Sequence, residues 1–91
     1  MNVYLSPEAE EQLQSLLEYL DNSWSSKVCD NFIEKFERAL QNIAWSPLAY
    51  PLSDKLPGLH KCVVTRQTSI YYMIEGDAIL VVAILDNRQN L

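Results

Sequence analysis

The apolar segment of residues 78–85 restricts the possible folds of this chain more than any other feature. All eight of its residues are apolar. A run of that length, rich in Ile, Leu and Val, predicts a central strand covered on both faces, and it is too short to span a membrane. The Glu-Gly-Asp sequence at residues 75–77 predicts a hairpin turn in which glycine supplies the unusual dihedrals. The partner strand is then expected at residues 69–74.

Two further strands and one long loop are expected. Residues 60–66 are rich in Val and Thr and predict a strand, joined to the next strand by a tight connection at residues 67–68. A short strand is predicted at residues 3–5. Residues 47–59 contain three prolines and one glycine, which indicates a loop held in shape by proline.

Two amphipathic helices are predicted between the first strand and this loop. Ser6 has the properties of a helix N-cap, followed by Pro7 and then by leucines at helical spacing, so the first helix should end near residues 21–22. The second helix is expected to begin at residue 25 or 26 and to end at residues 46–47, before proline. The short connection predicts an antiparallel helical hairpin, which must bury its apolar stripes against one face of the sheet.

The predicted fold class is therefore α+β. A short N-terminal strand is followed by the helical hairpin and then by a three-stranded antiparallel meander, which completes a mostly antiparallel sheet. A chain of 91 residues fits one domain, so residues 1–91 are expected to fold as a single unit. The apolar fraction of 48% is normal for a packed globular domain.

Composition and missing motifs exclude several functional classes. The net charge of −5 disfavours nonspecific binding to nucleic acid or to anionic membranes. Cys29 and Cys62 lie in apolar stretches without CxxC spacing, which favours buried, reduced thiols in a cytoplasmic protein. His60 is the single histidine and has no neighbouring ligand set, so neither a metal nor another cofactor is expected, and a structural or solvent-facing role is favoured for it.

The polar segment of residues 86–90 is the best indication of function. It follows the apolar strand directly and contains Asn87 and Arg88. Segments that leave a buried strand often carry function, because the scaffold fixes where they begin. Lys61 and Arg66 belong to the predicted strand at residues 60–66, and antiparallel pairing could bring some of these cations together on the concave side of the sheet. The alternative for each cation is an ordinary solubilising charge.

Four segments together resemble the RelE/ParE family of toxins. They are Ser-Pro-Glu-Ala-Glu at residues 6–10, Leu-Pro-Gly-Leu-His-Lys-Cys-Val-Val at 56–64, Ile-Tyr-Tyr-Met-Ile-Glu-Gly-Asp at 70–77, and the apolar strand with its polar exit at 78–90. The resemblance implies a type II toxin, neutralised by the flexible segment of an antitoxin encoded beside it. It also implies one of two mechanisms: RelE-like members cut messenger RNA on the ribosome, whereas ParE-like members poison DNA gyrase.

Three departures from the RelE-like pattern favour the ParE-like branch. Ser69 stands where those nucleases usually have an arginine, no tyrosine follows Arg88, and the basic residues of the preceding strand are represented only by Lys61 and Arg66. We therefore expect a toxin that acts by binding a protein target such as gyrase rather than as an enzyme, and that forms a hetero-oligomer with its antitoxin. The candidates for target contact are Arg88, Asn87, Arg66 and Lys61.

Two alternatives remain open at this point. The first is a metal-independent, ribosome-dependent mRNA endoribonuclease, in which Lys61, Arg66 and Arg88 would stabilise the charged phosphate and His60 would transfer protons. The second is a degenerate binding domain without toxicity. Because the chain is acidic, the antitoxin contact is expected to rely on apolar burial more than on charge.

Overall fold

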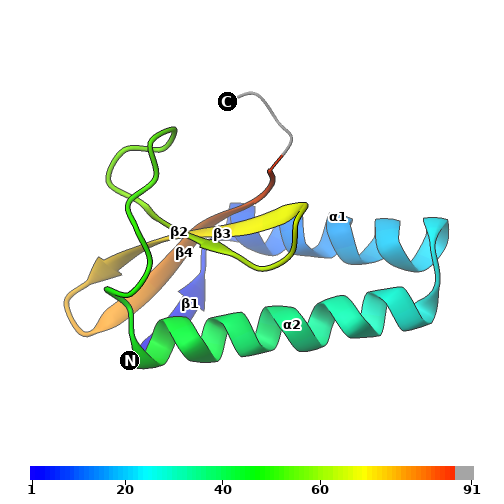
Figure 1. Cartoon of the computed structure of the whole chain (residues 1–91), viewed down its shortest axis with the longest axis horizontal. Coiled ribbons are helices and arrows are strands. Elements are labelled where there is room, and N and C mark those ends of the chain that lie inside the picture. Colours follow the sequence, from blue (N-terminus) through cyan, green and yellow to red (C-terminus); the bar gives the residue numbers. More distant parts are fainter. Residues whose placement is uncertain (88–91) are drawn as a thin grey trace.

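The fold is an α+β arrangement of two helices and one four-stranded sheet, as predicted (Figure 1). The structure, a computed structural model, describes residues 1–87. The strands lie in the order β1-β4-β3-β2; β1 runs parallel to β4, and the other neighbours are antiparallel. In chain order, the elements are β1 (Asn2–Leu5), α1 (Pro7–Ser23), α2 (Ser26–Trp45), β2 (His60–Val63), β3 (Thr68–Glu75) and β4 (Ala78–Asp86).

Both helices begin at the serines that the sequence indicates. The Ser6 hydroxyl accepts a hydrogen bond from the Ala9 amide at 3.0 Å, and the Ser25 hydroxyl accepts one from the Val28 amide at 3.1 Å. Each bond satisfies one of the amides that have no partner at the start of a helix. Helix α2 ends at Trp45, shortly before Pro47, as predicted. Neither helix within the described residues combines the length and apolar character needed to cross a membrane.

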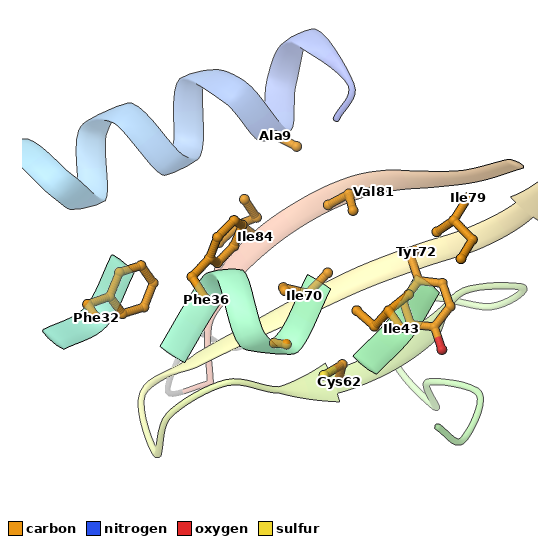
Figure 2. Packing of buried hydrophobic residues seen from close by; sticks show 11 residues of the cluster. Ala9, Phe32, Phe36, Ile43, Cys62, Ile70, Tyr72, Ile79, Val81 and Ile84 are labelled. Carbon is orange, nitrogen blue, oxygen red and sulfur yellow. The ribbon is translucent and has the colours of Figure 1, made fainter. Parts of the chain in front are cut away.

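The core lies between the helical hairpin and one face of the sheet (Figure 2). Aromatic side chains from α2 pack against alternate residues of the strands, and the leucines of α1 border this cluster without being fully buried. The strand residues of the core are Cys62, Ile70, Tyr72, Ile79, Val81 and Ile84. Alternation along each strand, together with a register shift in β4 between Val81 and Ile84, places all of them on the side of the helices.

Strand β4 is central, but the prediction that it is covered on both faces is only partly correct. Its burial alternates along the first half of the strand, with Ile79 and Val81 buried and Leu80 between them only partly buried. No helix of the described chain packs on the opposite face, because both helices lie on one side of the sheet (Figure 1). The continuous apolar run therefore has one face in the core and one face that remains partly open.

A β-bulge interrupts the pairing of β4 with β3. Tyr71 pairs with Ala83 and Tyr72 pairs with Val81, which leaves Val82 as an extra residue. The carbonyl of Val82 instead accepts a hydrogen bond from the Ser6 hydroxyl at 2.9 Å. The same hydroxyl therefore caps α1 and donates a hydrogen bond to the carbonyl of the bulged residue.

The connection between β2 and β3 differs from the prediction. Strand β2 ends at Val63, and residues 64–67 form the turn, so the predicted strand to residue 66 and the tight connection at residues 67–68 were both wrong. Thr65 causes the earlier break, because its hydroxyl accepts hydrogen bonds from the amides of Gln67 at 3.2 Å and Thr68 at 3.1 Å. Local bonds of this kind compete with strand pairing.

Candidate functional site

Asn87, at the exit of β4, is bonded to the turn between β2 and β3. Its side-chain amide donates to the carbonyls of Arg66 at 3.0 Å and Thr65 at 3.4 Å, and its side-chain oxygen accepts from the Ser69 hydroxyl at 2.5 Å. Its backbone N–H donates to the Gln67 carbonyl at 2.6 Å. We call this set of four bonds the Asn87 clamp. It joins the end of β4 to the beginning of β3 and to the preceding turn.

The clamp brings together two of the predicted contact residues, Asn87 and Arg66. Arg66 is exposed in the turn, and its carbonyl binds Asn87 directly. Arg88 follows Asn87 in sequence, but it lies outside the described residues. Lys61 lies further along β2, where its ammonium group is 6.0 Å from the centre of the Tyr71 ring, on the face without helices.

His60 lies on the other side of the sheet from Lys61. Its ring stacks on Tyr72, with a centroid separation of 5.1 Å and an interplanar angle of 17°. Its Nδ1 lies 2.8 Å from the Tyr50 carbonyl, which requires the proton on that nitrogen because a carbonyl only accepts. Adjacent strand residues point to opposite faces. His60 is therefore not brought together with Lys61, and its contacts are those of a structural residue.

The groups around His60 anchor the proline-rich loop to the sheet. The Tyr72 hydroxyl donates to the Pro47 carbonyl at 2.6 Å, the Tyr50 and Tyr72 rings meet edge to face, and the Lys61 amide donates to the Pro51 carbonyl at 2.9 Å. Burial raises the pKa of Tyr72 to about 12, and the neighbouring Cys62 and Tyr50 add to the shift. Burial also raises the pKa of the Cys62 thiol. Both groups keep their protons at neutral pH, which suits packing better than nucleophilic chemistry.

An open apolar groove of about 350 Å³ runs between α1 and α2. The leucine stripe of α1 forms one wall, and α2 contributes the other with a single carboxylate at the rim. Its lining residues are Leu5, Leu13, Leu17, Phe32, Ile33, Phe36, Glu37 and Leu40. The sequence indicated these stripes as core, but it did not show that the two helices leave part of each stripe uncovered. The apolar side chains that line this groove are partly buried or buried, and the exposed Glu37 is its one charged residue.

A second groove, of about 300 Å³, lies between α2 and the edge strand β2. Its α2 side carries Lys35, Arg38 and Asn42, and its β2 side includes the exposed Val63. Arg38 forms an exposed ion pair with Glu34 at 3.2 Å. The sequence alone does not place these α2 cations beside the sheet edge, because that position depends on the tertiary packing.

Residues 1–87 contain no cluster of three His, Cys, Asp or Glu side chains that could hold a metal ion. The polar groups in this part of the chain instead form the clamp, the helix caps and the loop anchor. Candidate recognition features of the described residues include the two grooves and the end of the sheet around Asn87 and Arg66.

Comparison with known proteins gives one match to a protein family. Residues 3–91 match the family described as "ParE toxin of type II toxin-antitoxin system, parDE". No curated protein sequence matches the chain.

Several solved structures share the fold. A structure of the chromosomal ParDE toxin–antitoxin system from P. aeruginosa has a TM-score of 0.80 at 11% identity, covering 94% of this chain and 95% of its own. A YoeB/ParE toxin from Agrobacterium tumefaciens has a TM-score of 0.67 at 15% identity, covering 96% of this chain and 99% of its own. A YoeB-YefM complex from Staphylococcus aureus has a TM-score of 0.63 at 14% identity, covering 93% of this chain and 94% of its own. At these identities the likeness concerns the fold.

Proposed function

The chain belongs to the family of ParE toxins of type II toxin–antitoxin systems, and from this membership we propose that a cognate antitoxin holds it inactive in a cytoplasmic hetero-oligomer. We further propose that the free protein arrests growth by binding a protein target such as DNA gyrase. In this proposal the toxin acts through contact and carries out no reaction of its own.

The position of His60 is the observation that supports a protein target over RNA cleavage. Cleavage of RNA without a metal needs cations at the phosphate and a positioned acid or base. His60 stacks on Tyr72 and bonds to the loop, whereas Lys61 points to the opposite face. The only histidine therefore does not share a surface with the strand cation that would stabilise the phosphate. The net charge of −5 also opposes docking on ribosomal RNA.

We propose that Arg88 is the main target contact and that Arg66 contributes a second one. Arg66 is exposed in the turn that binds Asn87, and Arg88 is the next residue in the chain after Asn87. A guanidinium can bind a partner carboxylate through two parallel hydrogen bonds, which gives a charged contact with defined geometry.

We propose that the groove between α1 and α2 receives an amphipathic segment of the antitoxin. The groove is lined almost entirely by apolar side chains, and the one charged residue, Glu37, lies in the outer wall. Such a surface gains from being covered by apolar residues at helical spacing. This assignment separates the inhibitor site from the proposed target contact at the exit of β4.

A supercoiling assay with purified gyrase tests the target. We expect the wild-type chain to inhibit supercoiling and Arg88→Ala to lose about tenfold or more in potency, as for an arginine at the centre of an interface. Lys27→Ala, which removes an exposed cation from the first turn of α2, is the matched control and should inhibit like the wild type.

Two results would count against this proposal. One is full gyrase activity at micromolar concentrations of the wild-type chain. The other is cleavage of messenger RNA in a cell-free translation reaction, abolished by Arg66→Ala, which would establish the ribonuclease alternative instead.

A further inference from the structure

We infer that the groove between α2 and β2 binds an extended, acidic segment of the protein target, which adds to the sheet as a strand beside β2. The inference rests on the proposed function, and it assigns a binding surface to the target within the described residues. This groove shares no residue with the apolar groove between α1 and α2, which is assigned to the antitoxin. Target and antitoxin are thereby placed on different sides of α2.

The outer edge of β2 is only partly covered. This strand is the last of the sheet, and the proline-rich loop covers its beginning, where the Lys61 amide donates to the Pro51 carbonyl at 2.9 Å. The Val64 amide donates in the opposite direction, to the Thr68 carbonyl at 2.9 Å. Backbone groups alternate along an antiparallel strand, so the Val63 amide points outward, as the Lys61 amide does. No strand within residues 1–87 continues this edge beyond the loop, which leaves backbone groups for another chain to pair with.

Lys35 and Arg38 give the α2 side of this groove a positive charge. Both side chains are exposed and lie one turn apart, and Asn42 continues the row by another turn. Lys35 forms no ion pair in the described part of the chain, and the pair of Arg38 with Glu34 joins side chains that are 65% and 70% exposed. An exposed pair of this kind contributes little energy and leaves other guanidinium donors available. Two cations beside an open strand edge therefore favour a partner segment that carries carboxylates.

Trp45 continues the same side of α2 with the most exposed large apolar side chain of the described residues. It is 89% exposed, and the spacing of residues 35, 38, 42 and 45 places it on the side of the helix that carries the two cations. Helical side chains lean toward the N-terminus of the helix, so this ring covers the turn that contains Asn42. Tryptophan is enriched among the residues that dominate binding energy at protein interfaces. The row thus combines charged and apolar contacts.

The chemistry of the occupant follows from these features. Pairing with the backbone of β2 requires an extended chain, in which alternate side chains face α2. We expect carboxylates opposite Lys35 and Arg38, and an apolar side chain near Trp45. The antitoxin is a poorer fit to this groove, because its proposed site is apolar and lies between α1 and α2.

Three substitutions remove one feature each. Lys35→Glu reverses a charge in the groove, and Lys27→Glu is its matched control, at an exposed lysine of the same helix that does not line the groove. Val63→Pro deletes the outward amide and leaves the neighbouring amides that pair with β3 in place. Trp45→Ala removes the exposed ring, and Trp24→Ala is its control, at a tryptophan that is 67% exposed at the end of α1.

The readouts are growth arrest on expression at matched protein amounts, affinity for the antitoxin, and the unfolding midpoint. Growth arrest reports the action of the toxin whatever its target. We expect each groove variant to lose toxic potency by on the order of tenfold, as for a central interface residue, and both control variants to arrest growth like the wild type. Antitoxin affinity should stay within about twofold in all five variants, because sites without shared partners act independently.

Several results would overturn the inference. One is full toxicity of Lys35→Glu and Val63→Pro, and another is an equal loss in Lys35→Glu and its control Lys27→Glu. A loss of antitoxin affinity in Lys35→Glu at an unchanged unfolding midpoint would assign the groove to the antitoxin instead. If Val63→Pro lowers the unfolding midpoint, Lys35→Glu and its control decide the question. A wild-type chain that causes no growth arrest would refute the proposed function itself, and the inference with it.

Discussion

Tyr72 is the largest fully buried side chain of the described structure, and it links the sheet to the proline-rich loop. Its hydroxyl donates to the Pro47 carbonyl, His60 stacks on its ring, and Tyr50 meets it edge to face. The ring therefore contributes apolar burial, while the hydroxyl satisfies a carbonyl of a loop that has few regular hydrogen bonds. These contacts explain why the single histidine lies where it does.

The raised pKa of Tyr72 predicts a loss of stability at alkaline pH. The folded-state pKa is about 12, whereas an unfolded tyrosine titrates near pH 10. Between these values the folded state holds a proton that the unfolded state releases, so the stabilisation is present below about pH 10 and is lost as the pH rises toward 12. Thermal unfolding measured from pH 8 to pH 12 should show this decline, and Tyr72→Phe should show a shallower one.

The same substitution has a cost at neutral pH. Tyr72→Phe leaves the Pro47 carbonyl without its donor and should lower the free energy of unfolding by about 1–2 kcal/mol. Tyr4→Phe, at an exposed tyrosine of β1, is the control and should behave like the wild type in both experiments. Parallel pH profiles for the wild type and Tyr72→Phe would contradict the role given to the hydroxyl.

At the scale of elements, α1 completes the edge of β4 where β1 ends. Strand β1 pairs with β4 only as far as Val81. Beyond that point, the Ser6 hydroxyl binds the Val82 carbonyl, and the side-chain oxygen of Gln12 accepts from the Ile84 amide at 2.7 Å. Side chains of a helix thus substitute for a neighbouring strand, and the backbone groups of the central strand stay satisfied.

Gln12→Ala tests whether the side chains of α1 take the place of a neighbouring strand. The change should leave the partly buried Ile84 amide without an acceptor and lower the free energy of unfolding by about 1–2 kcal/mol. Gln14→Ala removes an exposed glutamine from the same helix and should cost much less, because the side chain of Gln14 bonds only to Glu18 in the described structure. Urea unfolding gives both values. Equal destabilisation, or an unchanged rate of hydrogen exchange at Ile84 in Gln12→Ala, would refute the assigned role.

At the scale of the whole molecule, the chain combines an acidic total charge with an apolar groove of about 350 Å³ between its two helices. The net charge of −5 argues against recognition of a partner by a broad positive surface, while the groove between α1 and α2 offers apolar contacts along two helices. Added salt does not weaken apolar burial, whereas it screens exposed ion pairs. The two sources of affinity can therefore be separated experimentally.

We predict that affinity for the antitoxin changes little with salt. Calorimetric titrations from about 0.1 M to 1 M salt, a range over which the Debye length falls about threefold, should give dissociation constants within about an order of magnitude of one another. A steep loss of affinity with added salt would contradict burial of the groove as the main contribution.

Two matched variants of α2 test whether the antitoxin binds in the groove between α1 and α2. Ile33→Glu places a charge in the groove wall, while Val28→Glu places one at an exposed position of the same helix that does not line the groove. Ile33→Glu should weaken the antitoxin complex by on the order of tenfold or more, through the cost of burying a charge, and Val28→Glu should not. Both variants should still arrest growth in the absence of antitoxin.

Much of the fold follows from local patterns in the sequence. The caps at Ser6 and Ser25, the proline after α2, and the apolar run of β4 determined the type and order of the elements. These signals depend on residues a few positions apart, so they can be interpreted without knowing the fold. The errors occurred where a local bond competes with strand pairing, as at Thr65, whose hydroxyl ends β2 earlier than its Val- and Thr-rich sequence indicates.

The candidate site was predictable only in part. The sequence singled out the polar exit of β4 and the cations at positions 61 and 66, and the structure places Asn87 against the turn that carries Arg66. The sequence alone could not assign different roles to His60 and Lys61. The two side chains point to opposite faces of a strand, and this difference matters only when helices cover one of the faces. The groove between the helices was likewise hidden, because apolar periodicity does not reveal how closely two helices pack.

The sequence by itself determined an α+β chain with a helical hairpin and a sheet built around residues 78–85. Only the tertiary structure decided that the Ser6 hydroxyl bonds to the Val82 carbonyl at the bulge and that the Ser69 hydroxyl bonds to Asn87. The first pair is separated by 76 positions in the sequence and the second pair by 18. The physical reason is the difference in range. Helix caps and strand alternation are set by neighbouring residues, whereas the partner of a buried polar group depends on the register of distant strands, which exists only after the chain has folded.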